Sequence, residues 1–331
     1  AYRQGIEAFR SGMKEGTLFM GGIFNVGIGV IDAMRTGGDV GARWDCSKIE
    51  VHRGERDRYH GSGYVKRAIM SALNGYFMHG KFWINDGDYL VVREDRSELT
   101  LNEARTWATI LGLYGGSVIL GDNMITLSPE RKEVINKILP LYIQAAKPLD
   151  FLQQEIPGIM VLNIDREDES WKVVCLINYT DKTETKRLDF DAIGLDSEAE
   201  HHIYGFWEQK YYGLRQGSLD INLAAHACEV LSIRKDLKRP QIVGTDMHIT
   251  QGGVEFKEVK WVAGRLSVHL SAKAASGGGR IIMHLPFGWT TSTGLSVEGD
   301  TNQGSKRLLS WIIPKESSPI MEVELTCQRQ S

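Results

Sequence analysis

The chain has 331 residues, which is enough for two or three domains with buried cores. Its 39 basic and 42 acidic residues give a net charge of −3, and neither sign forms a long block, which excludes the basic footprint of a nucleic-acid-binding protein. No run of about 18 apolar residues occurs and the first residues lack the layout of a signal peptide, so we expect a cytoplasmic chain without a membrane partner.

Cysteine and histidine spacing gives no sign of a metal site. The four cysteines are far apart and form no C-x-x-C pair, and no H-x-x-x-H spacing occurs. The sequence therefore predicts no bound metal, no cofactor and no disulfide framework, and it favours a reducing compartment.

The first part of the chain alternates strand patterns with helix patterns. Strands are predicted over residues 17–23, 33–35, 81–84 and 117–120, and helices over residues 64–79, 101–114 and 128–147. Thr100 and Glu103 have the spacing of a capping box at the start of the second of these helices. Strands that alternate with helices predict a parallel sheet, with ligands bound beyond the carboxyl ends of its strands.

Polar residues follow these predicted strands at several places. Arg35 to Asp39 reads Arg-Thr-Gly-Gly-Asp, and Phe82 to Asp88 reads Phe-Trp-Ile-Asn-Asp-Gly-Asp. A carboxylic acid can protonate a glycosidic oxygen, and a guanidinium four residues away can hold a neighbouring sugar hydroxyl. The pattern therefore favours carbohydrate chemistry, although an aspartate after Gly-Gly also commonly caps a turn.

After about Leu149 the pattern changes to short strands separated by polar turns. Such runs cover residues 171–178, 186–190, 202–207 and 229–234, and a further group follows Pro240. This spacing predicts antiparallel sheets. We expect three domains, over residues 1–149, 150–237 and 238–331.

Four stretches together resemble a known family. They are Phe19-Met-Gly-Gly, Asp32-Ala-Met-Arg-Thr-Gly-Gly-Asp-Val, Phe82-Trp-Ile-Asn-Asp-Gly-Asp and Gly115-Gly-Ser-Val-Ile-Leu-Gly-Asp. They resemble the fifth to eighth barrel strands of the α-galactosidases of glycoside hydrolase family 36 and their clan relatives, over roughly residues 1 to 235. The resemblance implies an α/β part followed by an all-β part, namely the second half of a (β/α)8 TIM barrel with C-terminal antiparallel β-sandwich domains.

The resemblance also implies roles for individual residues. Asp39 corresponds to the general acid/base of the family, and Arg35 corresponds to the arginine that binds the sugar beside the cleaved bond. Asp86 and Asp88 correspond to acidic residues that shape the floor of the site, with Gly87 where the family usually has proline. Further substrate contacts are expected at Gly21, Gly22, Trp83 and Asp122, although tryptophan is more often a core residue.

The family retains anomeric configuration and uses a nucleophile from a Lys-x-Asp motif on the fourth barrel strand. The look-alike Arg187-Leu-Asp189 lies in a β-strand pattern of the second domain. Because four of eight barrel units are visible, we expect the nucleophile in a missing N-terminal half. An exposed half-barrel is also expected to associate with itself, with that missing half or with another chain.

The resemblance leads to hydrolysis of terminal α-galactosides as the first hypothesis. One alternative is α-galactosyl transfer, as in raffinose-synthase-like relatives, with a sugar hydroxyl in place of water. Another is a non-catalytic carbohydrate-binding or structural remnant. A Lys-x-Asp motif on an apolar strand upstream of Ala1 would favour the enzyme over the remnant.

Overall fold

The computed structural model describes residues 1–22, 25–45, 63–167, 169–292, 297–298, 307–313, 315 and 322–329. The last residue of the strand predicted over 17–23 lies outside these ranges. The chain forms two compact units. Unit 1 comprises residues 1–160, 177–182 and 224–227, and unit 2 comprises residues 161–176, 183–223 and 228–331. Within the described ranges, no helix is long and apolar enough to span a membrane.

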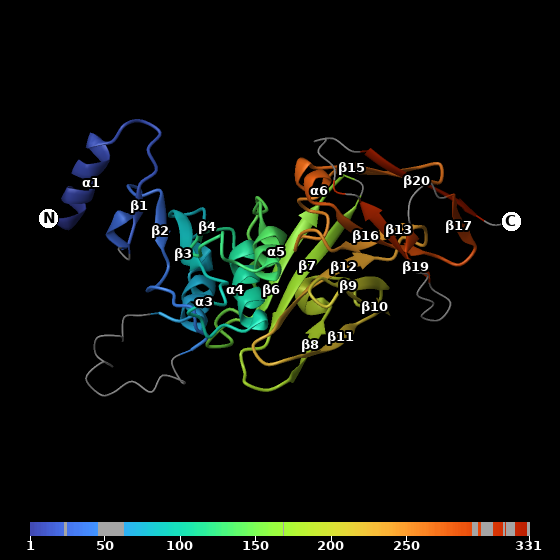
Figure 1. Ribbon diagram of the computed structural model, residues 1–331, viewed down its shortest axis with the longest axis horizontal. Coiled ribbons are helices and arrows are strands. Elements are labelled where there is room, and N and C mark those ends of the chain that lie inside the picture. Colours follow the sequence, from blue (N-terminus) through green and yellow to red (C-terminus); the bar gives the residue numbers. More distant parts are fainter. Residues whose placement is uncertain are drawn as a thin grey trace. The chain divides into compact units, whose positions relative to one another are not determined.

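Unit 1 is built on a parallel sheet whose strands follow one another in chain order (Figure 1). The strands are β1 (Met20–Gly21), β2 (Ala33–Arg35), β3 (Ile84–Leu90) and β4 (Ser117–Leu120), in the order β1-β2-β3-β4. All three pairings are parallel, which confirms the sheet that the alternating pattern predicts. The α-helices in the described residues of unit 1 are α1 (Tyr2–Gly12), α3 (Val65–Asn74), α4 (Leu101–Leu113) and α5 (Pro129–Ile138).

Two elements of unit 1 differ from their predicted bounds. The third strand begins at Ile84, where the prediction ends it, and it continues through four buried residues, Asn85 to Asp88. Hydrogen bonds inside the protein replace water there, because Asn85 Nδ2 donates to the Gly75 carbonyl at 3.0 Å and Ser117 Oγ donates to Asp86 Oδ1 at 3.0 Å. The last helix ends at Ile138 instead of residue 147, since the residue before Pro140 is extended, as proline requires.

The capping box at the start of α4 is confirmed. Thr100 Oγ1 accepts a hydrogen bond from the Glu103 backbone N–H at 3.3 Å, and Glu103 Oε2 accepts one from the Thr100 backbone N–H at 2.7 Å. Two backbone donors that the helix leaves unpaired are thereby satisfied.

Replacing Thr100 by alanine removes one of these two hydrogen bonds. We expect the free energy of unfolding to fall by about 1 kcal/mol, as is typical for an N-cap. Thr100→Ser, which keeps the hydroxyl, is the matched control and should retain most of that stability. A Thr100→Ala variant as stable in urea as the parent would show that the box contributes nothing.

Unit 2 begins with antiparallel strands. β9 (His201–Gly205) lies between β10 (Lys210–Arg215) and β12 (Cys228–Lys235), and the sheet continues through β7 (Ser170–Ile177) to β6 (Ile159–Asp165). The start of β6 belongs to unit 1, where the Leu149 N–H donates to the Ile159 carbonyl next to β5 (Lys147–Pro148). β8 (Glu184–Asp189) and β11 (Ser218–Leu223) form a separate antiparallel pair. The short strands predicted after Leu149 are therefore confirmed.

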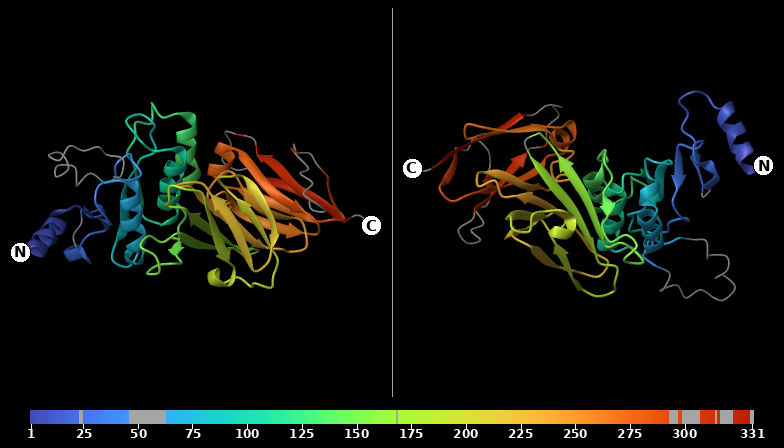
Figure 2. Two further views of the ribbon diagram at one scale, coloured as in Figure 1. Left: turned by 90° about the horizontal axis from the view of Figure 1, so that it is seen from below. Right: turned by 180° about the vertical axis from the view of Figure 1, so that it is seen from behind.

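Two four-stranded sheets complete unit 2, and Figure 2 shows their strands in orange and red. One contains β13 (Gln241–Thr245), β16 (Gly279–Leu285), β19 (Arg307–Ile313) and β18 (Val297–Glu298), and the other contains β14 (Phe256–Val262), β15 (Arg265–Leu270), β20 (Glu322–Arg329) and β17 (Trp289–Ser292). Alternate residues of β15 and β16, such as Val268 and Met283, belong to one shared core. A short helix, α6 (Ala272–Gly277), precedes β16.

Candidate functional site

The carboxyl end of the parallel sheet gathers charged side chains from two neighbouring strands. Arg35 ends β2 and lies opposite Asp86 of β3, and Asp86 in turn lies opposite Ser117 of β4. Because parallel strands end at the same edge, the segment that follows Arg35 meets the second half of β3 there. The register therefore brings together two stretches that are far apart in the sequence.

Arg35 contacts two carboxylates at this edge. Its Nη1 donates to Asp39 Oδ1 at 2.8 Å, and its Nη2 forms an ion pair with Asp88 Oδ2 at 2.5 Å. Asp88 Oδ2 also accepts a hydrogen bond from the Val40 backbone N–H at 2.7 Å. The planar guanidinium thus holds the segment that carries Asp39 against β3.

The three acidic residues at this edge differ in how far their side chains are exposed to solvent. The Asp39 side chain is 72% exposed, whereas that of Asp88 is 7% exposed and Asp86 is buried. Asp86 Oδ1 accepts hydrogen bonds from Ser117 Oγ and from the Asp88 backbone N–H, each at 3.0 Å. Asp39 is therefore the carboxylate of this group that a bound molecule can approach, while Asp86 and Asp88 fix the backbone beneath it.

The backbone of β3 is irregular between the acidic residues. Asp88 has a φ of 75°, in the left-handed region that side chains other than glycine rarely adopt, and the pairing of β3 with β4 shifts register between Asp86 and Tyr89. This irregularity sets the direction of the Asp88 side chain toward Arg35. At Gly87 an added Cβ atom would lie 2.6 Å from Leu111 Cδ2, so the close packing of α4 explains glycine at a position where the resembled family has proline.

Two uncharged side chains form hydrogen bonds with the backbone of β3. Burial, followed by the nearby charge of Asp86, raises the pKa of the Tyr114 hydroxyl, which stays protonated and donates to the Asn85 carbonyl at 3.2 Å. Burial lowers the pKa of His79, whose neutral Nδ1 accepts the Asn85 backbone N–H at 3.2 Å. Sequence reasoning did not single out these two residues for the site, because each acts through the backbone of β3.

The other predicted contacts have partners outside this group among the described residues. Asp122 Oδ1 pairs with Arg93 at 2.9 Å, and Asp122 Oδ2 accepts the backbone N–H groups of Val92 and Arg93 at 2.6 Å and 3.0 Å. Trp83 immediately precedes β3, at the opposite end of the strand from Asp88, and it is buried in a cluster with Ile6, Ile31 and Met34. That packing is the ordinary role of a core tryptophan.

Two glycines at the end of β1 are predicted to lie near the sugar, and Gly21 is the last residue of that strand. An added Cβ atom at Gly21 would lie 2.8 Å from Ile31 Cδ1, so this glycine allows close packing against the chain that leads into β2. Gly22 follows in a bend. Neither shows a contact with Arg35 or Asp39 among the described residues, and their role in sugar binding stays a prediction.

A second cluster of ionisable side chains lies in unit 1, and no motif in the sequence predicts it. His226 Nδ1 lies 2.6 Å from Glu103 Oε1, its Nε2 lies 2.9 Å from Asp181 Oδ1, and its ring stacks on Trp44 at 4.6 Å between centroids. These residues come from four distant parts of the chain. Their mutual pairing ties the start of α4 to segments 177–182 and 224–227 of the same unit.

Solved structures similar in fold to this chain are glycosidases of the α-galactosidase type. With α-galactosidase I from Mortierella vinacea the TM-score is 0.50, with 18% sequence identity over 63% of this chain and 54% of the other. With the GH27 β-L-arabinopyranosidase from Geobacillus stearothermophilus the TM-score is 0.53, with 12% identity over 72% and 55%. No protein-family profile matches the sequence. The chain spans a little over half the length of these two enzymes, and assignment to family 36 in particular stays a prediction.

Proposed function

We propose that this chain carries the acid/base half of a retaining glycosidase that acts on terminal α-galactosides. The observation that supports this most strongly is the Arg35 clamp, which holds the exposed Asp39 carboxyl at the carboxyl end of a parallel sheet. That edge is where barrel enzymes place their catalytic groups. The likeness in fold to an α-galactosidase is consistent with the same chemistry.

In the proposed reaction Asp39 acts twice. It first protonates the glycosidic oxygen while a second carboxylate attacks the anomeric carbon from the opposite face, which forms a covalent glycosyl-enzyme. Asp39 then takes a proton from water, which attacks the same carbon and releases the sugar. Arg35 binds a hydroxyl of the sugar, and Asp86 and Asp88 hold the floor of the site.

The attacking carboxylate is proposed to come from a strand outside the four described here. A complete barrel has eight strands, and the described residues of unit 1 form a parallel sheet of four. Asp189, in the Arg187-Leu-Asp189 look-alike, lies in β8 of unit 2 and pairs with Arg187 at 2.9 Å. We therefore place the nucleophile in a further segment of the same protein.

The proposal is tested by assaying the full-length gene product on a panel of aryl glycosides. The panel contains α-D-galactosides, α-D-glucosides and β-L-arabinopyranosides. A β-L-arabinopyranoside has the ring configuration of an α-D-galactoside and lacks only its hydroxymethyl group. We expect hydrolysis of the α-galactoside with retained configuration. A folded protein that cleaves none of the panel contradicts the proposal, and product formed only with an added sugar acceptor indicates the transferase instead.

Replacing Arg35 by lysine keeps the charge and removes the fork that spans Asp39 and Asp88. We expect KM for the α-galactoside to rise about 10-fold to 100-fold, the scale of one charge-assisted hydrogen bond, while the pH profile of kcat keeps its shape. Arg3→Lys, which alters an exposed ion pair with Glu7 on α1, is the matched control. An unchanged KM in Arg35→Lys would show that this arginine does not contact the sugar.

A further inference from the structure

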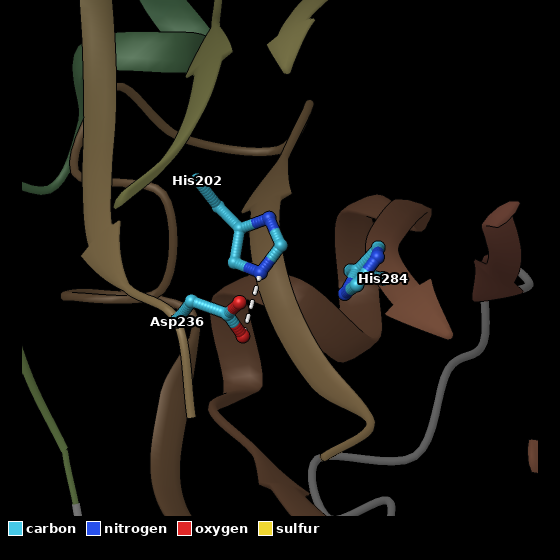
Figure 3. Close-up of side chains that lie close together, drawn as sticks. All are labelled: His202, Asp236 and His284. Carbon is cyan, nitrogen blue, oxygen red and sulfur yellow. Dashed lines mark ion pairs between the residues drawn. The ribbon is translucent and has the colours of Figure 1, made fainter. Parts of the chain in front are cut away.

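We propose that His202, Asp236 and His284 form a binding site for a divalent transition-metal ion, with Zn²⁺ as the ion that fits best. One ligand atom from each of the three side chains lies within 4.8 Å of the other two. Figure 3 shows the ring of His202 facing the carboxylate of Asp236, with the ring of His284 beside them. Imidazole and carboxylate are the ligands that Zn²⁺ uses besides thiolate.

Strand alternation explains why two distant histidines meet. On β9, His202 shares a face with Tyr204, and on β16, His284 shares a face with Ile282. Tyr204 and Ile282 belong to one buried cluster, which packs these two faces against each other. The rings of His202 and His284 consequently lie 4.3 Å apart between centroids.

Asp236 supplies the third ligand from the connection between β12 and β13. Its Oδ1 lies 3.4 Å from His202 Nε2. Tetrahedral Zn²⁺ with bonds of about 2.0–2.1 Å places its ligand atoms roughly 3.3 Å apart, so this pair already has the spacing of two ligands on one ion. In the proposed site a His284 nitrogen, which lies within 4.8 Å of the other two ligand atoms, moves closer to complete a set of three protein ligands, and water takes the fourth position.

The surrounding groups orient these ligands as they do in protein metal sites. His202 Nδ1 lies 2.6 Å from the Tyr211 hydroxyl, so with Nε2 on the metal, Nδ1 carries the proton and donates it to that oxygen. Asp236 Oδ1 accepts the Lys238 backbone N–H at 2.8 Å, and Oδ2 pairs with Lys238 Nζ at 2.9 Å. Lys238 Nζ also forms an ion pair with Glu200.

Burial distinguishes this group from an ordinary surface ion pair. His202 and His284 are both buried, and the Asp236 side chain is 5% exposed. The buried Nε2 of His202 faces Asp236 Oδ1 at 3.4 Å, which is longer than a well-formed hydrogen bond. An ion between the two groups would bind both of them at ordinary ligand distances. The ion would link β9, β16 and the connection after β12 within unit 2.

The test uses the full chain without a histidine affinity tag, first dialysed against a chelator. Titration with Zn²⁺ and with Co²⁺ should show one ion per chain, a rise in Tm, and the visible absorption bands of tetrahedral Co²⁺. His284→Gln should abolish stoichiometric binding, and Tyr211→Phe should weaken it about 10-fold to 100-fold, because it removes only the partner of Nδ1. His201→Gln is the matched control, since His201 precedes His202 on β9 and points to the other face.

Metal-free circular dichroism of each variant shows whether it is folded. If His284→Gln does not fold, the Co²⁺ spectrum of the parent and the affinity of Tyr211→Phe still decide the question. A folded, chelated parent that binds no ion, or binding that survives His284→Gln unchanged, overturns the proposal and leaves a simple ion pair between His202 and Asp236.

Discussion

Replacing Asp39 by asparagine in the full-length protein is expected to lower turnover of α-galactosides with poor leaving groups by about 100-fold to 10,000-fold. Asparagine keeps the size of the side chain and removes the proton that the leaving oxygen needs, and this range is the usual contribution of general acid–base catalysis. Aryl galactosides with activated leaving groups should lose less in the first step, because they depart with little protonation.

The dependence on leaving group separates catalysis from general damage to the fold. A variant that is merely misfolded loses activity on both substrate types in equal proportion. Asp220→Asn, which changes an exposed aspartate on β11 of unit 2, is the control and should leave both rates unchanged. If Asp39→Asn turns over both substrates like the parent, Asp39 is not the acid/base, and Asp86 and Asp88 become the next candidates to substitute.

Replacing Trp107 by alanine is expected to lower the stability of unit 1 by about 3–5 kcal/mol, the cost of removing a large aromatic side chain from a core. Trp107 is fully buried in α4, and its Nε1 donates to the Tyr89 carbonyl of β3 at 3.1 Å. The substitution leaves both a cavity and an unpaired carbonyl beside the strand that carries Asp86 and Asp88.

Urea denaturation, followed by tryptophan fluorescence and by proteolysis of each unit, measures the effect of Trp107→Ala. The transition of unit 1 should move to lower urea, while that of unit 2 stays in place. Trp107→Phe fills most of the space and should lose less, and Ile125→Ala, at a side chain that is 88% exposed, should change stability by no more than about 0.5 kcal/mol. A Trp107→Ala transition that coincides with the parent would show that α4 does not anchor β3.

Much of the fold follows from local patterns. The capping box of Thr100 and Glu103 marks the start of α4, and the alternation of strand and helix patterns predicts the parallel sheet of unit 1. The prediction ended β3 too early because Asn-Asp-Gly-Asp has a low propensity for strands. The strand continues through these residues because partners such as Ser117 and Tyr114 form hydrogen bonds with them. Pro140 indicates that α5 ends early, but the helical pattern on both sides of it led to a prediction that was too long.

Part of the candidate site was predictable from the order of the strands and helices. Arg35 and Asp88 meet because neighbouring parallel strands end at one edge, which the order of elements predicts without knowledge of distances. The pairing of Asp122 with Arg93 is invisible in the sequence, since nothing local distinguishes a carboxylate held by backbone N–H groups from one that faces a substrate. The proposed metal ligands His202, Asp236 and His284 have no motif spacing, and strand packing alone brings them together.

Mass spectrometry of Asp39→Asn during reaction with an activated aryl α-galactoside tests the central claim most directly. Without the base that activates water, the galactosyl-enzyme should accumulate, and azide, which needs no base, should release it as α-galactosyl azide. The labelled peptide should come from outside the sheet formed by β1 to β4. Unchanged turnover with no covalent adduct and no response to azide would contradict the assignment of Asp39 as the acid/base of a retaining α-galactosidase.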